Sequence, residues 1–197
     1  MSNARGLAVG FSVHTGWAAS VSVAGPRRSP AIVDRSRIRL ADSDDAVRAE
    51  VYHRAALLSG AAAARFVRDS RNAAVRNARA AFDALQKSQP LLAAGLPVSA
   101  GRLPSDLAAI LGSHPLIHTA EGVFYREAIA AAAADCGLAV VRIPRRELPE
   151  RFAAALKTND AGALEWLQAV GRALGPPWAR DQKDAAMAAV VALDASR

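Results

Sequence analysis

The sequence contains very little cysteine and no long apolar run. Its one cysteine, Cys136, excludes an intramolecular disulfide and a cysteine metal cluster. No apolar run approaches the roughly 20 residues of a membrane-spanning helix. The first residues also lack the apolar region and cleavage site of a secretory signal peptide. We therefore expect a cytoplasmic protein in which Cys136 is buried and structural.

The composition is typical of one folded domain covering residues 1–197. This length suffices for a sizeable core, and the 52% hydrophobic and 22% charged residues argue against a disordered or membrane protein. The net charge of +7 comes mostly from arginine, which suits phosphate contacts. This charge permits nucleic-acid binding, but frequent alanine and arginine can equally reflect a GC-rich genome.

Residues 1–40 predict a three-stranded antiparallel meander. Apolar and small residues alternate in 7–14 and again in 17–24, with a tight turn at 14–16. A third strand follows in 31–40, with one buried and one basic face. One face of the first strand is small and polar, because it carries Gly10, Ser12 and His14. Such a face lets a helix, a ligand or a substrate approach the sheet closely.

Residues 44–88 have a helical pattern that begins near Asp45 and could break near Gly60. The second part is amphipathic. Its expected apolar face comprises Val67, Ala74, Ala78, Ala81 and Leu85. Its opposite, basic face comprises Arg65, Arg68, Arg76, Arg79 and Lys87. The basic face is either simply solvated or a contact surface for a phosphate backbone.

Residues 91–143 predict a β-α-β unit. Its helix spans 119–136 and its last strand spans 138–143. Its first strand is either 91–100 or 114–120, and we favour 91–100 because the alternative leaves a very long connection. Residues 148–195 are helical, with segments at 148–156, 161–174 and 181–193. The chain is thus an α/β protein of order β-β-β-α-β-α-β-α, with a mixed five-stranded sheet flanked by helices.

This order of elements resembles the ribonuclease H-like fold, and three short motifs strengthen the resemblance. Residues 9–18 resemble the first hairpin of RuvC-type Holliday junction resolvases, where a strand enters a Thr-Gly-aromatic turn. Residues 181–186 resemble their last motif, with two aspartates three positions apart, and 119–124 resemble the segment of their second acid. The sequence is closer still to bacterial proteins without a known activity that open with GF-x-V-x-(T/S)-G.

The resemblance implies phosphodiester cleavage with two Mg²⁺ or Mn²⁺ ions, which need about four carboxylates. The first acid of the family falls on Gly10, or on Ser12 if the turn is counted differently, and neither is a carboxylate. Glu121, Asp181 and Asp184 remain as candidate catalytic and metal-binding residues. The metal ions are expected only if these acids are catalytic.

Each remaining candidate also has a structural interpretation. Asp181 can be a helix N-cap and Asp184 the acid of a capping-box variant. Lys183, between them, either contacts phosphate or is solvated. Glu121 matches the second acid only if 114–120 is the strand. Arg126 either pairs with Glu121, which we favour, or meets a phosphate.

Four histidines, His14, His53, His114 and His118, offer a different metal chemistry. The H-x-x-x-H spacing of His114 and His118 aligns two ligands only on a helix. Pro115 disfavours a helical conformation at His114. We therefore expect no histidine metal site.

Three hypotheses follow for the function. We favour a ribonuclease H-like protein with a degenerate active site that binds DNA or RNA. The first alternative is an active metal-dependent nuclease using Glu121, Asp181 and Asp184. The second is a small-molecule or phosphate-binding domain of the same topology, although no glycine-rich phosphate loop is visible. No membrane partner is expected, and the sequence leaves the oligomeric state open.

Overall fold

The computed structural model describes residues 6–42, 49–87, 89–99 and 101–196. The helix start expected near Asp45 lies outside these residues. Within these residues, the helical segments are α2 (Val51–Ala55), α3 (Gly60–Gln86), α4 (Leu107–Leu111), α5 (His114–Asp135), the 3-10 turn η1 (Arg145–Glu147), α6 (Leu148–Leu156), α7 (Asp160–Leu174) and α8 (Arg180–Ala195).

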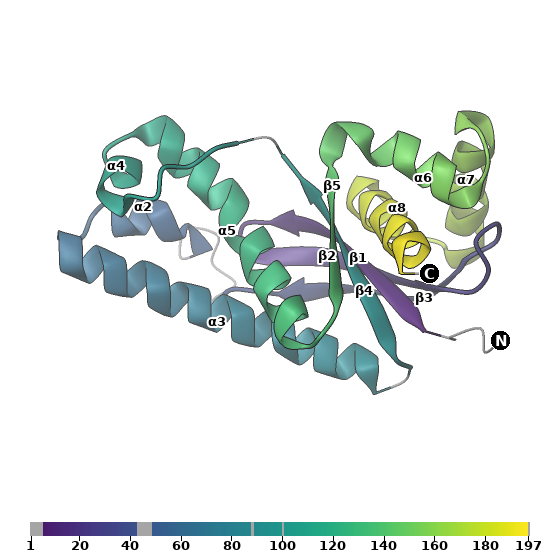
Figure 1. The fold of residues 1–197 in the computed structure, drawn as a ribbon, viewed down its shortest axis with the longest axis horizontal. Helices are drawn as coiled ribbons and strands as arrows, with labels where there is room; N and C mark the ends of the chain where they lie inside the picture. The colour runs from purple at the N-terminus through teal and green to yellow at the C-terminus, as the bar shows by residue number, and fades with distance from the viewer. Residues whose placement is uncertain (1–5, 43–48, 88, 100, 197) are drawn as a thin grey trace.

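A mixed five-stranded sheet organises the fold (Figure 1). Its strands are β1 (Leu7–His14), β2 (Trp17–Ala24), β3 (Ala31–Arg39), β4 (Leu91–Val98) and β5 (Ala139–Pro144). The spatial order is β3-β2-β1-β4-β5. The first three strands are antiparallel, and β4 and β5 run parallel to β1. The expected fold class is confirmed, and 91–100 rather than 114–120 supplies the fourth strand.

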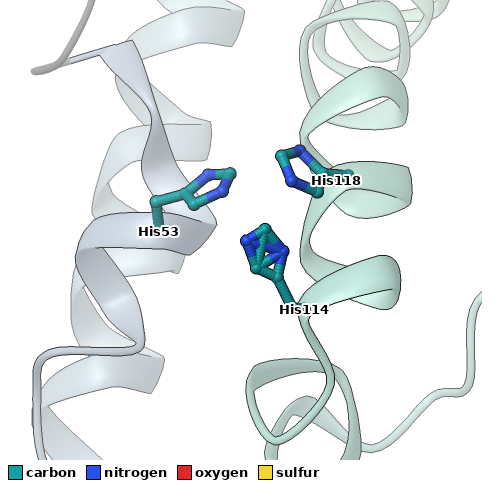
Figure 2. Close-up of side chains that lie close together, drawn as sticks. All are labelled: His53, His114 and His118. Carbon is teal, nitrogen blue, oxygen red and sulfur yellow. The ribbon is translucent and has the colours of Figure 1, made fainter.

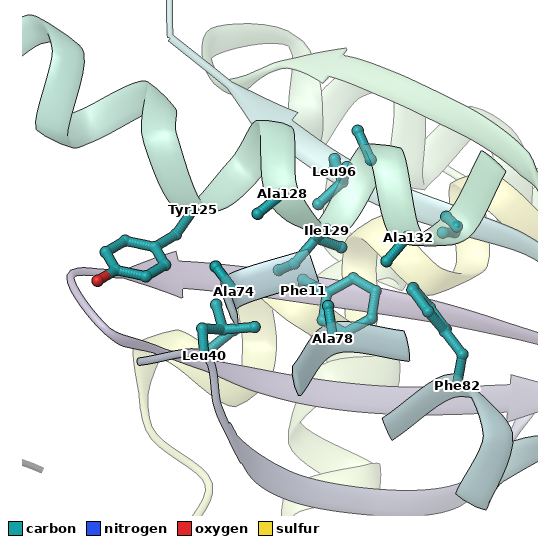
Figure 3. Packing of buried hydrophobic residues seen from close by; sticks show 14 of the residues in the cluster. Phe11, Leu40, Ala74, Ala78, Phe82, Leu96, Tyr125, Ala128, Ile129 and Ala132 are labelled. Atoms are coloured by element: carbon teal, nitrogen blue, oxygen red, sulfur yellow. The ribbon is translucent and has the colours of Figure 1, made fainter. Parts of the chain in front are cut away.

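Helices cover both faces of this sheet. Helices α3 and α5 lie side by side over one face, and α8 crosses the other next to α6 (Figure 1). Leu7, Val9 and Phe11 of β1 point into the first core, where the Phe11 ring meets the Phe82 ring edge-on with centroids 5.7 Å apart (Figure 3). The residues between them, such as Ala8 and Gly10, face α8 on the other side of the sheet. The predicted alternation along β1 therefore separates one hydrophobic core under α3 and α5 from a second core under α8.

The small face of β1 is covered by α8. Gly10 and Gly95 are neighbours in the parallel β1–β4 pair. A methyl group added to Gly10 would lie 2.0 Å from the carbonyl oxygen of Ala185, and one added to Gly95 would lie 2.2 Å from that of Ala188. The two glycines therefore let the backbone of α8 approach the sheet more closely than any side chain would allow.

The expected faces of α3 are partly corrected. The helix begins at Gly60, as the possible break suggested, and its arginine stripe is exposed. Its fully buried residues are Ala63, Ala73, Ala74, Ala78 and Phe82. Val67, Ala81 and Leu85 of the expected apolar face are only half-buried. Phe82 is buried because it follows Ala74 and Ala78 at intervals of four residues and therefore lies on the same face of the helix.

Two other local predictions are wrong, and one is partly correct. Helix α5 begins at His114 rather than at residue 119, because Pro115 lies in the first turn, where a helix needs no backbone N–H. In the third predicted strand, Leu40 is buried as expected, but β3 itself ends at Arg39, lies at the edge of the sheet and has no fully buried residue. Cys136 is half-buried, because it follows the last residue of α5. Among the described residues, no helix is long and apolar enough to span a membrane.

We predict that Gly10→Ala destabilises the fold at the upper end of roughly 1–3 kcal/mol, because backbone atoms of α8 would have to move. Gly60→Ala is the matched control, since nothing lies within 4 Å of the added methyl group. Urea unfolding of both variants measures the difference. Equal stabilities would show that α8 does not pack against Gly10 this closely.

Candidate functional site

Asp181 joins the first turn of α8 to the end of β1. Its Oδ1 accepts a hydrogen bond from Ser12 Oγ at 3.1 Å and one from His14 Nε2 at 2.8 Å. The His14 ring stacks on Trp17 with centroids 4.3 Å apart, and the Arg37 guanidinium lies 3.9 Å from the Trp17 ring centre. Ser12 and His14 lie on the small face of β1, where we expected another group to approach the sheet. The group that they contact is the carboxylate of Asp181.

The capping-box prediction for Asp181 and Asp184 is wrong. Helix α8 starts at Arg180, so Asp181 lies inside the first turn and Ala179 is the N-cap. The N–H of Ala179 donates to Gln182 Oε1 at 3.1 Å, which leaves both aspartates free of this task. Asp181 still lies where a carboxylate stabilises the helix dipole.

Asp184 contacts two arginines. Its Oδ2 lies 3.4 Å from Nη1 of Arg145, the first residue of η1 directly after β5, and 3.9 Å from Arg180 Nε. Its side chain is only 15% exposed. Burial raises the pKa of Asp184, and the two guanidinium groups oppose this rise while the nearby Asp181 adds to it.

Glu121 stabilises a helix end. Its Oε1 accepts the backbone N–H groups of Tyr52, at 2.5 Å, and His53, at 3.1 Å, in the first turn of α2. The N-cap of α2, Glu50, makes no side-chain cap of its own, so Glu121 caps α2 from α5. It is a buried residue, and burial raises its pKa although the two backbone N–H groups favour the charged form.

The structure does not bring the three candidate acids together. Asp181 and Asp184 lie on α8, whereas Glu121 lies on α5, which packs on the opposite face of the sheet. Within the described ranges, one group of three or more histidine, cysteine or acidic side chains is placed to share an ion, and it contains none of these acids.

That group is His53, His114 and His118 (Figure 2). Their ring nitrogens, one from each residue, all lie within 4.8 Å of one another. The expectation of no histidine site rested on Pro115, which is accommodated in the first turn of α5. His114 and His118 therefore lie one turn apart on the same helix, as their spacing allows, and nothing in the sequence pointed to His53 as their neighbour.

The expected nucleic-acid contacts divide between two surfaces. The exposed stripe of Arg65, Arg68, Arg76 and Arg79 lies on α3, and exposed Lys183 lies on α8. These helices cover opposite faces of the sheet, so the five residues do not form one surface. Within the stripe, Arg68 lies 3.3 Å from its neighbour Asp69.

Three arginines outside the stripe contact other parts of the protein. Arg35, expected on a basic face of β3, donates to the carbonyl oxygens of residues 174–177 and holds the turn before α8. Arg126 lies against Gly122 and does not pair with Glu121 as we had favoured. Burial lowers the pKa of Arg126, and nearby Arg145 lowers it further. Arg145 is a site residue that sequence reasoning missed, because only the sheet order brings the end of β5 beside α8.

No family model matches the sequence, and no curated protein matches it. Several solved structures are similar to the chain, including two of RuvC. Thermus thermophilus RuvC has a TM-score of 0.49 at 11% identity, covering 94% of this chain and 92% of that one. T. thermophilus RuvC in complex with Holliday junction substrate has a TM-score of 0.51 at 10% identity, covering 94% and 91%. The chain has a RuvC-type, ribonuclease H-like fold. At this identity the likeness concerns the RuvC fold alone.

We predict that Glu121→Ala destabilises the protein by about 1–3 kcal/mol, because two N–H groups of α2 lose their acceptor. Glu121→Gln is the matched variant, since its amide oxygen can still accept both bonds, and its loss should be smaller. Denaturant unfolding measures both. Equal losses would mean that the carboxylate charge, rather than the acceptor, is what α2 requires.

The raised pKa of Asp184 leads us to predict that the stability of the protein depends on pH. Because its pKa is raised in the folded state, its contribution to the free energy of unfolding should fall as the pH rises from 3.8 through the folded pKa. Asp184→Asn removes this contribution. The difference in stability between the wild type and the variant should therefore decrease with pH over this window. An increase would show that Arg145 and Arg180 outweigh the cost of burial.

Proposed function

We propose that this chain is a ribonuclease H-like domain that binds DNA or RNA and does not cleave it by the two-metal resolvase reaction. The observation that carries the proposal is the contact of α8 with Gly10, the position where the resemblance places the first acid. A side chain there would meet the Ala185 carbonyl oxygen at 2.0 Å. A carboxylate at this position therefore has no room unless the backbone of α8 moves away from the sheet.

The other matching position, Ser12, supports the same proposal. Its side chain is buried and its hydroxyl is hydrogen-bonded to Asp181. The Oδ1 atom of Asp181 that accepts this bond also accepts one from His14 Nε2. Asp184 is paired with Arg145 and Arg180. These partners neutralise or occupy the carboxylates that a pair of hard cations would need.

The α3 stripe supplies the proposed binding surface. From Arg65 to Arg79 the helix rises about 21 Å at 1.5 Å per residue, which corresponds to about six base pairs of duplex. The side chains of Arg65, Arg76 and Arg79 are exposed along this length. A similar structure of RuvC holds a Holliday junction, which makes nucleic acid the ligand class to test first. A nucleic-acid ligand also implies a cytoplasmic location, as part of the same proposal.

Fluorescence anisotropy with a labelled four-way junction, a duplex and an RNA–DNA hybrid tests the binding. We expect the dissociation constant to rise for Arg76→Ala/Arg79→Ala on every substrate. The slope of log K against log salt should fall by about 0.9 for each lost phosphate contact. The control Arg151→Ala/Arg172→Ala, on α6 and α7, removes the same charge from other exposed positions and should retain the wild-type slope.

The same substrates incubated with Mg²⁺ or Mn²⁺ test the absence of cleavage. The proposal predicts intact substrate. Cleavage that Asp184→Asn abolishes would overturn the non-cleaving part. No binding of any substrate at low salt would overturn the binding part, as would an equal loss in the control variant.

A further inference from the structure

Three imidazole rings converge outside the surface proposed for nucleic acid (Figure 2). His114 is the first residue of α5 and His118 follows one turn later, while His53 projects from α2. The centroids of the His114 and His118 rings are 4.4 Å apart. The His53 ring centroid lies 4.9 Å from that of His118 and 5.9 Å from that of His114.

We propose that His53, His114 and His118 bind one divalent transition-metal ion of the zinc type, and that Glu121 orients His53. Three neutral imidazoles suit zinc and its neighbours in the first transition row. They leave a fourth coordination position for water or another ligand. A nitrogen-only set does not suit Mg²⁺, which prefers oxygen ligands. This inference is therefore independent of the resolvase chemistry and of the proposed nucleic-acid binding.

The surroundings of His53 match those of a metal-binding histidine. Such a ring usually donates its second N–H to a carboxylate or carbonyl, which fixes the tautomer and the ring orientation. His53 Nδ1 lies 3.5 Å from Glu121 Oε1. Nδ1 and Glu121 Oε2 are both buried, and neither has a hydrogen-bond partner in the described part of the chain. A small rotation joins Nδ1 to the carboxylate and leaves Nε2 of His53 for the ion.

Glu121 is itself held in place. Its Oε1 accepts two backbone N–H groups from α2, one of them from His53. The carboxylate of Glu121, on α5, is therefore fixed to the backbone of His53, the residue whose imidazole it faces. The helix cap uses only Oε1, whereas Oε2 is buried without a hydrogen-bond partner in the described part of the chain. The proposed hydrogen bond from His53 Nδ1 would give Oε2 a partner.

The rings need only a small movement to close around an ion. With Zn–N distances of about 2.0–2.1 Å, tetrahedral ligand atoms lie about 3.4 Å apart. The present nitrogens lie within 4.8 Å of one another. His114 and His118 are exposed, so their side chains can rotate without moving the backbone. The ion would then link α2, a helix of five residues, to the long helix α5.

Titration calorimetry with zinc sulfate tests the proposal on untagged protein freed of metal by a chelator. We expect one ion per chain. Separate alanine substitutions of His53, His114 and His118 should weaken binding more than about 100-fold. Glu121→Gln should weaken it by about 10–100-fold, the effect of losing a carboxylate behind a ligating histidine. His14→Ala is the matched control, because His14 lies on β1 and outside the group, and it should bind zinc as the wild type does.

Thermal unfolding provides a second readout that does not depend on calorimetry. Zinc should raise the Tm of the wild type and of His14→Ala, and should leave that of His118→Ala unchanged, because an ion that binds the folded state stabilises it. His118 is exposed, so its substitution removes no core side chain and should leave the fold intact. Absence of saturable binding, or equal binding by the His14 and His118 variants, would overturn the proposal.

Discussion

The packing of α8 against Gly10 and Gly95 is the contact on which the rest of the structure depends. Because these two positions carry no side chain, the backbone of α8 lies directly on the centre of the sheet. This approach positions Asp181 beside Ser12 and His14, and Asp184 beside Arg145. The same approach fills the space in which the resemblance places a catalytic acid. The stability of the fold and the proposed absence of the resolvase reaction therefore share one physical cause, the close packing of α8 on the sheet.

The three acids that could have formed a metal centre are each engaged elsewhere. Asp181 binds the first hairpin, Asp184 pairs with arginines, and Glu121 caps α2 on the other side of the sheet. Each contact lowers the cost of an incompletely solvated carboxylate. On α3, by contrast, Arg65, Arg68, Arg76 and Arg79 form an exposed stripe of positive charge. A surface of this kind favours phosphate binding over the assembly of divalent cations.

The sheet could be predicted because its signals are local. The alternation in residues 7–24, the tight turn and the apolar run after Pro90 specify strands without reference to the rest of the chain. The absence of an acid at Gly10 could also be predicted. The partner of Gly10 could not, since its contact with Ala185 joins positions 175 residues apart. The role of Glu121 was equally hidden, because the amides that it caps belong to a distant helix.

The histidines show how a correct local rule can mislead. A residue before proline is biased away from the helical conformation, yet the first turn of a helix tolerates proline. The second rule prevails at Pro115, because α5 begins one residue earlier. His53 then joins the pair through the packing of α2 on α5, which no spacing in the sequence encodes.

A crystal structure of the protein grown with excess Mn²⁺ tests the central claim most directly, because anomalous scattering locates the ions. The closed packing of α8 predicts no manganese beside Gly10 and no ion shared by Asp181 and Asp184. A pair of manganese ions held between these aspartates, with α8 displaced from the sheet, would contradict it.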